Sequence, residues 1–409
     1  MKKTVPDLAL FGGVPAFSQS LHVNRPNLGS RDGFLQRLEE ILDRRWFTND
    51  GPLVIELEAA LADYLGVRHC VLTCNGTMAL QLASSALGLQ GEVIVPSFTF
   101  IATAHALLWQ GLRPVFCDID RGTWSVDPEA CEALVSDRTS AIIGVHLWGR
   151  PCDTERLEAI ARRHSLSLLF DAAHAFGCGH RGRKIGGFGD AEIFSFHATK
   201  LFHTMEGGAV TTNDDTLADR IRRQRNFGFN PQGVVEELGI NGKMSEASAA
   251  MGLVNLEAID RLLQEAKTNY QAYRDGLSGI PGLKLITYDE AEGHNHHYVV
   301  VEVDEAEAGL RRDQLLRVLR AENILARDYF FPGCHRMEPY SGRGIDTALP
   351  VTEELAGCVL VLPAGGAVST RQINEICAII RLATGQSDTV RSLLSSGAAS
   401  AMGDCSSAV

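Results

Sequence analysis

The sequence predicts an α/β fold, with a large domain built on a mostly parallel seven-stranded sheet and a smaller C-terminal α/β domain. Two observations carry this prediction. Between residues 70 and 212, short and almost continuously apolar runs alternate with helix-like segments, as in a sheet buried on both faces. Such alternation is typical of parallel strands joined by right-handed crossover helices. A second group of strand-like and helical runs follows beyond residue 297.

The apolar runs of the large domain give seven expected strands. They cover residues 70–74, 92–96, 113–118, 141–147, 167–171, 191–196 and 208–212. Helical patterns lie between several of them and beyond the last one, over residues 77–87, 99–110, 154–164 and 244–265. The smaller domain is expected to add strands over 298–303 and 358–362 and helices over 312–322 and 370–382.

These elements divide the chain into four expected segments. They are an N-terminal arm over residues 1–30, a large domain over 31–265, a small C-terminal domain over 266–388 and a disordered tail over 389–409. The tail is rich in Ser, Ala and Gly, so it has too little apolar surface to offset the entropy lost on ordering.

Charge and apolar patterning exclude several classes of partner. The formal net charge of -12 argues against nucleic acid or an anionic membrane as the main partner. No run of about 18 apolar residues predicts a membrane span, and the N-terminus lacks a signal-peptide pattern, so we expect a cytoplasmic protein. The ten cysteines include no C-x-x-C pair. This pattern favours free thiols and predicts neither a disulfide framework nor a metal site.

Polar residues follow the expected strands at the points where the strands end. Asp171 ends one strand and Lys200 follows the next, while Gly76 and Thr77 begin a helix after the first strand and Phe98 follows the second. Ligands of parallel sheets bind beyond the carboxyl ends of the strands. An acid, an amine, a helix N-terminus and an aromatic ring are therefore predicted to share one edge of the sheet.

Pyridoxal phosphate (PLP) requires these four features. Its aldehyde reacts with a neutral lysine, a form that desolvation favours. Its ring nitrogen stays protonated beside a buried carboxylate, and its phosphate suits a helix N-terminus. Taken singly, each residue has another explanation. Asp171 can cap a helix, Lys200 can be a surface charge, and Phe98, His174 and His197 can be core residues. The ordered set, and no single residue, indicates a PLP site.

The sequence resembles the nucleotide-sugar aminotransferases of the DegT/StrS family. The motifs that carry the resemblance cover roughly residues 30 to 385, in an order specific to that family. They are FSFHATK over 194–200, EGGAV over 206–210, LFDAAHAFG over 169–177, WFTNDGP over 46–52, NGTMAL over 75–80, PSFTF over 96–100 and LGINGKMSE over 238–246.

The resemblance implies the PLP-dependent transferase fold of type I and a homodimer with shared active sites. Carried over by position, the catalytic pair is Lys200, the Schiff-base lysine, and Asp171, the partner of the pyridinium nitrogen. The other implied cofactor contacts are Gly76, Thr77 and Ser195 at the phosphate, Phe98 stacked on the ring, His174 beside it, and Asn241 reaching the phosphate of the other subunit. Asn49, Lys243, Arg327 and His335 are candidates for sugar or diphosphate contact, with surface charge or capping as the alternative for each.

The resemblance also implies a reaction, namely transfer of an amino group from glutamate to a keto-sugar nucleotide. The run from His197 to Lys200 is similar to enzymes that aminate a 4-keto sugar, which favours dTDP-4-keto-6-deoxyglucose, an intermediate of deoxysugar and antibiotic biosynthesis. His203 and Met205 depart from the family pattern and leave the position of amination less certain. The alternatives are a keto-cyclitol, a 3-keto sugar nucleotide, a PLP-dependent elimination, or a non-catalytic binding protein. Lys200 stands where a related sugar dehydratase has histidine, which favours transamination.

Overall fold

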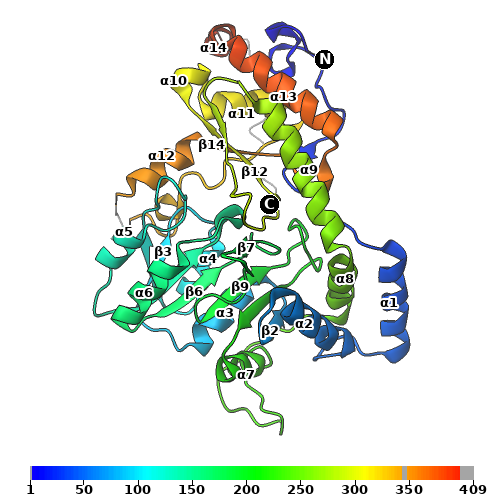
Figure 1. The fold of residues 1–409 in the computed structure, drawn as a ribbon, viewed down its shortest axis with the longest axis vertical. Coiled ribbons are helices and arrows are strands. Elements are labelled where there is room, and N and C mark those ends of the chain that lie inside the picture. Colours follow the sequence, from blue (N-terminus) through cyan, green and yellow to red (C-terminus); the bar gives the residue numbers. More distant parts are fainter. Residues whose placement is uncertain (1, 343–347, 397–409) are drawn as a thin grey trace.

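The central feature of the computed structural model, which describes residues 2–342 and 348–396, is a seven-stranded sheet (Figure 1). All its strands run in one direction except β10, which is antiparallel to both neighbours. In spatial order the strands are β2 (His69–Thr73), β10 (Gly208–Thr212), β9 (Ala191–Ser195), β6 (Ser167–Asp171), β5 (Thr139–Val145), β3 (Glu92–Pro96) and β4 (Arg113–Cys117). The predicted mostly parallel sheet of seven strands is confirmed.

Helices cover both faces of this sheet because successive residues along its strands are apolar. In β6, for example, Leu168 and Phe170 belong to one core and Leu169 to the core on the other face. One face is covered by α2 (Pro52–Leu65), α6 (Thr154–His164) and α8 (Glu246–Glu257), and the other by α3 (Gly76–Ala86), α4 (Ala102–Leu108) and α7 (Asp215–Gln224). At the margins, α1 (Arg31–Arg44) packs on α8 and α5 (Pro128–Ala133) on α6. The sheet is thus the middle of three layers.

The long helix α9 (Ile259–Leu277) runs from this part of the chain into the second domain. Its first turns contribute Ile259 and Leu262 to the core of the large domain, whereas Tyr270 and Tyr273 lie in the core of the second. We propose that the domain boundary falls inside this helix. The helix expected over 244–265 is in fact two helices, because the backbone leaves helical geometry at Ala258 and α9 then turns toward the second domain.

The second domain is built on a three-stranded antiparallel sheet of β11 (Leu283–Leu285), β12 (Val299–Val303) and β14 (Val359–Leu362). Its helices are α10 (Glu305–Ala308), α11 (Arg312–Ala321), α12 (Pro350–Cys358), α13 (Thr370–Gly385) and α14 (Ser387–Ser395). Two further strand pairs lie outside the main sheets, namely β1 (Leu21–His22) with β13 (Ile324–Leu325), and β7 (Gly179–His180) with β8 (Arg183–Lys184).

The first and the last segments that the structure describes both pack on this second domain. Val5 and Leu8 are fully buried in its core, so the N-terminal arm is anchored there. The tail expected to be disordered from residue 389 is helical as far as Ser395, because Val390 is fully buried in the same core. The remainder of that tail, residues 397–409, lies outside the described residues.

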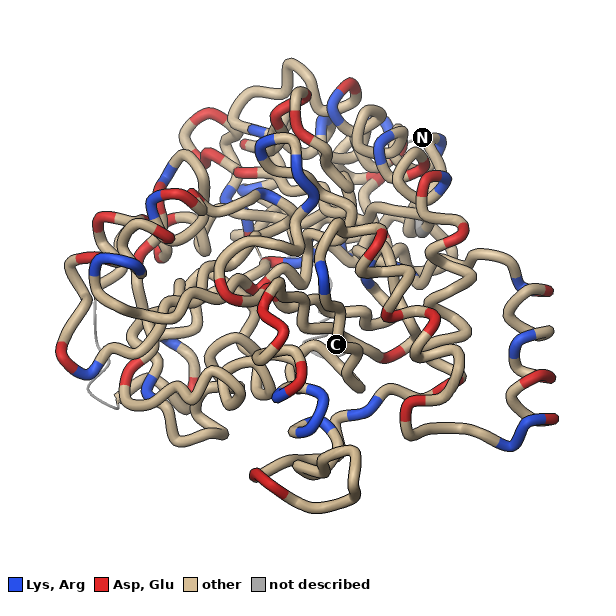
Figure 2. Tube along the Cα trace, turned by 60° about the horizontal axis from the view of Figure 1, so that its bottom comes forward, with Lys and Arg blue, Asp and Glu red and all other residues tan. Residues whose placement is uncertain are grey.

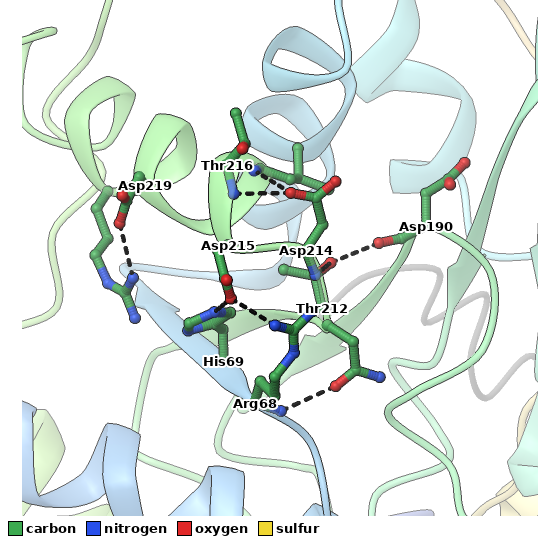
Figure 3. A network of polar contacts seen from close by, with 11 residues as sticks. Arg68, His69, Asp190, Thr212, Asp214, Asp215, Thr216 and Asp219 are labelled. Atoms are coloured by element: carbon green, nitrogen blue, oxygen red, sulfur yellow. Dashed lines mark hydrogen bonds and ion pairs between the residues drawn. The ribbon is translucent and has the colours of Figure 1, made fainter.

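Charged groups are spread over the surface. Figure 2 shows Lys and Arg interspersed with Asp and Glu along the trace. A denser polar network lies where the parallel strands begin, and there Asp215 contacts Arg68 at 2.9 Å and His69 at 2.7 Å (Figure 3). In residues 2–342 and 348–396, no helix combines the length and the apolar character that crossing a membrane requires.

Candidate active site

A cavity of about 420 Å³ opens at the carboxyl ends of β2, β6 and β9. The large domain contributes the residues that follow those strands, among them Asp171, Ser195 and Lys200. The second domain contributes Tyr298 and Arg327 from the opposite side. The cavity therefore lies where ligands of parallel sheets bind, beyond the carboxyl ends of the strands. The volume of the cavity is sufficient for a cofactor or small-molecule ligand.

Lys200 lies in the turn after β9, with its amine inside the cavity. Its Nζ donates to the hydroxyl of Tyr298 at 3.3 Å. Burial lowers the pKa of Lys200 to about 8, although the negative charge of Asp171 opposes the shift. A larger fraction of this amine is therefore neutral, and so nucleophilic, than of an exposed lysine at the same pH.

Asp171 ends β6 and lines the same cavity, with 6% of its surface exposed. Its Oδ2 accepts from Thr103 Oγ1 at 2.8 Å, and its Oδ1 accepts from the amide of Ala173 at 3.0 Å. Burial raises the pKa of this carboxyl, while those hydrogen bonds and the charge of Lys200 act against the shift. The carboxylate is thereby oriented, and a cation bound in the cavity would stabilise its charged form.

The N-terminus of α3 forms another part of the wall. The Asn75 side chain caps the helix by accepting from Met78, and Gly76 and Thr77 follow it in the lining. A Cβ placed on Gly76 would lie 2.9 Å from the Cβ of Ser195, so a side chain there would displace the end of β9. Amides in the first turn of a helix have no intrahelical acceptor, and the helix dipole is positive there. This corner is therefore suited to an anion such as phosphate.

His174 and several aromatic rings form the remaining wall. The His174 ring lies 4.5 Å from Tyr298 and nearly parallel to Phe330. Its Nδ1 accepts from the amide of Trp148 at 3.3 Å, and burial holds its pKa well below the usual value, so the ring is neutral. A neutral, apolar-faced ring can pack against a flat ligand without adding charge.

The prediction that Phe98 stacks on the cofactor ring is corrected by its position. Phe98 is 1% exposed and packs edge-on against Trp148 and Phe330, away from the cavity wall. Phe100, two residues later in the same motif, lines the cavity and is 48% exposed. The sequence pattern identified the aromatic segment but could not tell which of its two rings lines the cavity.

The four candidate substrate residues fall into three groups. Arg327 lines the cavity and supplies a cation there. His335 does not, because it is 2% exposed and held between Ser97 at 2.6 Å and Glu353 at 3.0 Å, an arrangement that stabilises the fold. The interpretation of His335 as a substrate contact is therefore not supported by its position.

Asn49 and Lys243 form the third group, together with Asn241. All three lie outside the cavity lining, on two loops. Arg225 holds these loops together through its buried side chain and its backbone carbonyl. Its guanidinium binds Asp50 at 2.9 Å, and its carbonyl accepts from the amide of Gly242 at 2.9 Å. Lys243 donates to Asn226 at 2.9 Å on the same loop. Within one chain these residues make a second cluster.

Sequence reasoning missed several residues of the cavity. They come from distant segments and are His22, Val23 and Asn24 of the N-terminal arm, Thr99, Phe100, Glu206, Tyr298, Tyr329 and Phe330. The arm reaches the site because Leu21 and His22 pair with β13 of the second domain. Thr99 and Phe100 belong to the motif PSFTF and Glu206 to the motif EGGAV, so these three had a sequence signal, whereas the others did not.

The chain is similar to known proteins over most of its length. Residues 30–381 match the DegT/DnrJ/EryC1/StrS aminotransferase family. A Shigella dysenteriae protein named dTDP-4-amino-4,6-dideoxy-D-glucose transaminase is 38% identical over 361 residues, which cover 88% of this chain and 98% of that protein. GDP-perosamine synthase of Caulobacter vibrioides is 36% identical over 346 residues, covering 83% of this chain and 92% of that one. A solved structure described as DesI with its TDP-sugar product has a TM-score of 0.93 and 49% identity over 96% of this chain and all of that one.

Proposed function

The chain belongs to the DegT/DnrJ/EryC1/StrS aminotransferase family, and we propose that it uses PLP to transfer the amino group of glutamate to a keto-sugar nucleotide. The prediction of an aminotransferase with the fold of type I is confirmed. The proposed acceptor is dTDP-4-keto-6-deoxyglucose. Support for it comes from the name of the Shigella relative and from the TDP-sugar product of the similar solved structure.

One observation carries the cofactor assignment, which is that Lys200 and Asp171 line one cavity together with the N-terminus of α3. The residues fit three polar groups of PLP, namely the aldehyde, the ring nitrogen and the phosphate. The partly neutral amine of Lys200 would bond the aldehyde, the buried carboxylate of Asp171 would pair with the ring nitrogen, and Gly76, Thr77 and Ser195 would hold the phosphate. We further propose that His174 lies beside the ring and that Phe100 stacks on it.

PLP, when bound, supplies an electron sink for the bond that breaks at the α carbon of the amino donor. The chain supplies the rest. Lys200 would move the proton at that carbon, as a positioned acid and base. Asp171, oriented by Thr103, would hold the proton of the ring nitrogen. Arg327 provides a cation for the carboxylates or the diphosphate of the two substrates.

We propose that the chain forms a homodimer in which the second cluster, Asn49, Asn241 and Lys243, faces the cavity of the partner subunit. The loop after α7 extends away from the body of the chain (Figure 1) and exposes Phe227, Val235 and Leu238, the last at 89% of its surface. Several exposed apolar side chains on one loop are typical of a protein interface. In such a dimer Asn241 would reach the phosphate in the partner's cavity, and Asn49 and Lys243 would approach the sugar nucleotide there.

A substrate panel tests this proposal. The pure chain should show a yellow, borohydride-reducible chromophore with PLP, and glutamate should bleach it with release of 2-oxoglutarate. Keto-sugar nucleotides with dTDP or GDP, a 3-keto isomer and a keto-cyclitol would then be compared by kcat/KM. The highest value is expected for dTDP-4-keto-6-deoxyglucose. A chain without the chromophore would be a binding protein, and one that consumes no glutamate would not be a transaminase.

The GDP-linked 4-keto sugar is the second candidate acceptor, because GDP-perosamine synthase is 36% identical to this chain. The panel separates it from the dTDP sugar directly, because both acceptors are assayed with the same chain and donor. The 3-keto sugar nucleotide and the keto-cyclitol remain as alternatives within the same reaction type.

A further inference from the structure

Tyr298 is the residue of the second domain that reaches the proposed catalytic lysine. It immediately precedes β12, whereas Lys200 follows β9 of the large sheet, and its hydroxyl lies 3.3 Å from Lys200 Nζ. This hydrogen bond therefore joins the two domains inside the cavity. The resemblance and the proposed cycle assign Tyr298 no role.

The surroundings of Tyr298 fix the position of its hydroxyl. The residue is 4% exposed, and its ring lies 4.5 Å from His174 and 4.9 Å from His297. Its backbone carbonyl accepts from the hydroxyl of Tyr288 at 3.0 Å. Ring packing on two sides and an anchored backbone leave the phenol one orientation, with its oxygen at the cavity wall.

The adjacent residue holds the other side of the same turn. His297 Nε2 lies 2.9 Å from the carbonyl of Thr199 and must donate, because a carbonyl oxygen only accepts. Burial lowers the pKa of His297 to about 4, so the ring is neutral at ordinary pH and carries its proton on Nε2. Two consecutive residues of the second domain thus bind Thr199 and Lys200.

Lys200 needs such a partner because its proposed task includes a charged state in a site that disfavours charge. The proton taken from the amino donor stays on Nζ until it is delivered to the cofactor. A phenol oxygen can accept a hydrogen bond from that ammonium without competing for the proton. Burial raises the pKa of Tyr298, so the phenol itself stays protonated and does not act as the base.

We propose that Tyr298 is a positioning residue, which accepts a hydrogen bond from protonated Lys200 and holds its Nζ at the cavity wall whenever that lysine is not bonded to the cofactor. The inference rests on the proposed function. It means that the second domain positions the lysine of the large domain that transfers the proton.

The charged state of Lys200 can be measured without turnover. The full chain is saturated with pyridoxamine phosphate, which cannot bond to lysine, and Lys200 is acetylated competitively across pH and quantified by peptide mass spectrometry. The midpoint for the unsubstituted chain is expected near pH 8. Tyr298→Phe keeps the packed ring and removes the acceptor, so the midpoint should fall by about one pH unit, the size of a hydrogen bond to a charged group.

Tyr329→Phe is the matched control. It removes another hydroxyl from the same cavity, and the described contacts of Tyr329 do not include Lys200, so its midpoint should equal that of the unsubstituted chain. Circular dichroism and thermal unfolding confirm that both variants fold. An unchanged midpoint in Tyr298→Phe would overturn the inference, as would equal shifts in the two variants.

Steady-state kinetics test the positioning role of Tyr298 independently. Tyr298→Phe should lower kcat about tenfold or more with little change in KM, because a mispositioned proton carrier slows chemistry and leaves binding intact. The isotope effect with α-deuterated glutamate should rise. A raised KM with unchanged kcat would make Tyr298 a substrate contact and overturn the inference. Loss of the PLP chromophore in the unsubstituted chain would instead defeat the proposed function, so the two failures are distinguishable.

Discussion

Polar side chains gather at both edges of the seven-stranded sheet, and the two groups differ in exposure and in partners. Where the parallel strands begin, Arg68 and His69 both pair with Asp215, which has 70% of its side chain exposed. Where the strands end, Asp171 and Lys200 face a cavity, and burial shifts the pKa of each toward the neutral form.

The difference shows how a site can be told from a surface network on physical grounds. Exposed ion pairs gain little free energy and cost little to lose, because water solvates each partner. Groups held in a cavity have lost that solvation and are stabilised when a ligand replaces it. Reactivity is therefore expected at the end of the sheet with fewer internal ion pairs.

Lys200→Ala should have the largest effect at the cavity edge. Removing the amine eliminates both the covalent attachment of PLP and the proton carrier, so kcat should fall by about 10⁴-fold or more. The measurements are absorbance of the PLP adduct and single-turnover release of 2-oxoglutarate. The far-ultraviolet circular dichroism spectrum should stay unchanged. Retained turnover would remove Lys200 from its assigned role and, with it, the contrast between the two edges.

Asp171→Asn comes next, with PLP still bound but kcat lower by about 10²- to 10³-fold, because a neutral amide does not keep the ring nitrogen protonated. Stopped-flow measurement of the glutamate half-reaction tests this. Thr103→Val is the matched control, since it removes one hydrogen bond to the carboxylate and leaves its charge, and it should cost much less. A rate in Asp171→Asn equal to that of the unsubstituted chain would contradict the assignment.

The pKa of Lys200 gives a pH dependence at this edge. Only the neutral amine bonds to PLP, so the rate of PLP attachment to the cofactor-free chain should rise about tenfold per pH unit below pH 8 and level off above it. Attachment followed by absorbance measures the profile. Nα-acetyl-lysine, whose only amine has the ordinary lysine pKa of about 10.4, is the reference. A profile that rises up to pH 10 would show that the cavity does not shift the lysine.

Asn241→Ala should have a smaller effect, because Asn241 is expected to supply one hydrogen bond to a phosphate from the partner subunit. Loss of one such bond raises the Kd of PLP about tenfold. Dialysis followed by cofactor quantification measures it. Asn230→Ala, on the same loop, is the control, since its side chain bonds Glu236. A monomer with full activity would refute the shared site.

The parts of this site that were predicted from sequence are those that follow strands. Asp171 ends an apolar run, and Gly76 and Lys200 each follow one within a few residues, so the rule that ligands bind at the strand ends of parallel sheets predicts that the three share one edge. His22 and Tyr298 have no such signal, because tertiary pairing and domain packing bring them to the cavity. His335 was misread for the opposite reason, since its ring is buried in a network that the sequence does not reveal. The helix over Ser387–Ser395 was missed because composition does not show that Val390 finds a core.

Asp215→Asn should have the smallest effect and makes the comparison sharpest. The hydrogen bond from His69 and the charge of Arg68 lower the pKa of Asp215, so any stability they add is present above the ordinary carboxyl pKa and is lost as pH falls through the lowered value. The side chain is exposed, so the change in Tm at neutral pH should be small and should shrink further in high salt. Because the strands separate this network from the cavity, kcat and the Kd of PLP should match those of the unsubstituted chain. Steady-state kinetics and thermal melts at two salt concentrations check both points. A fall in kcat comparable to that of Asp171→Asn would mean that the two edges are coupled, and the distinction drawn between them would fail.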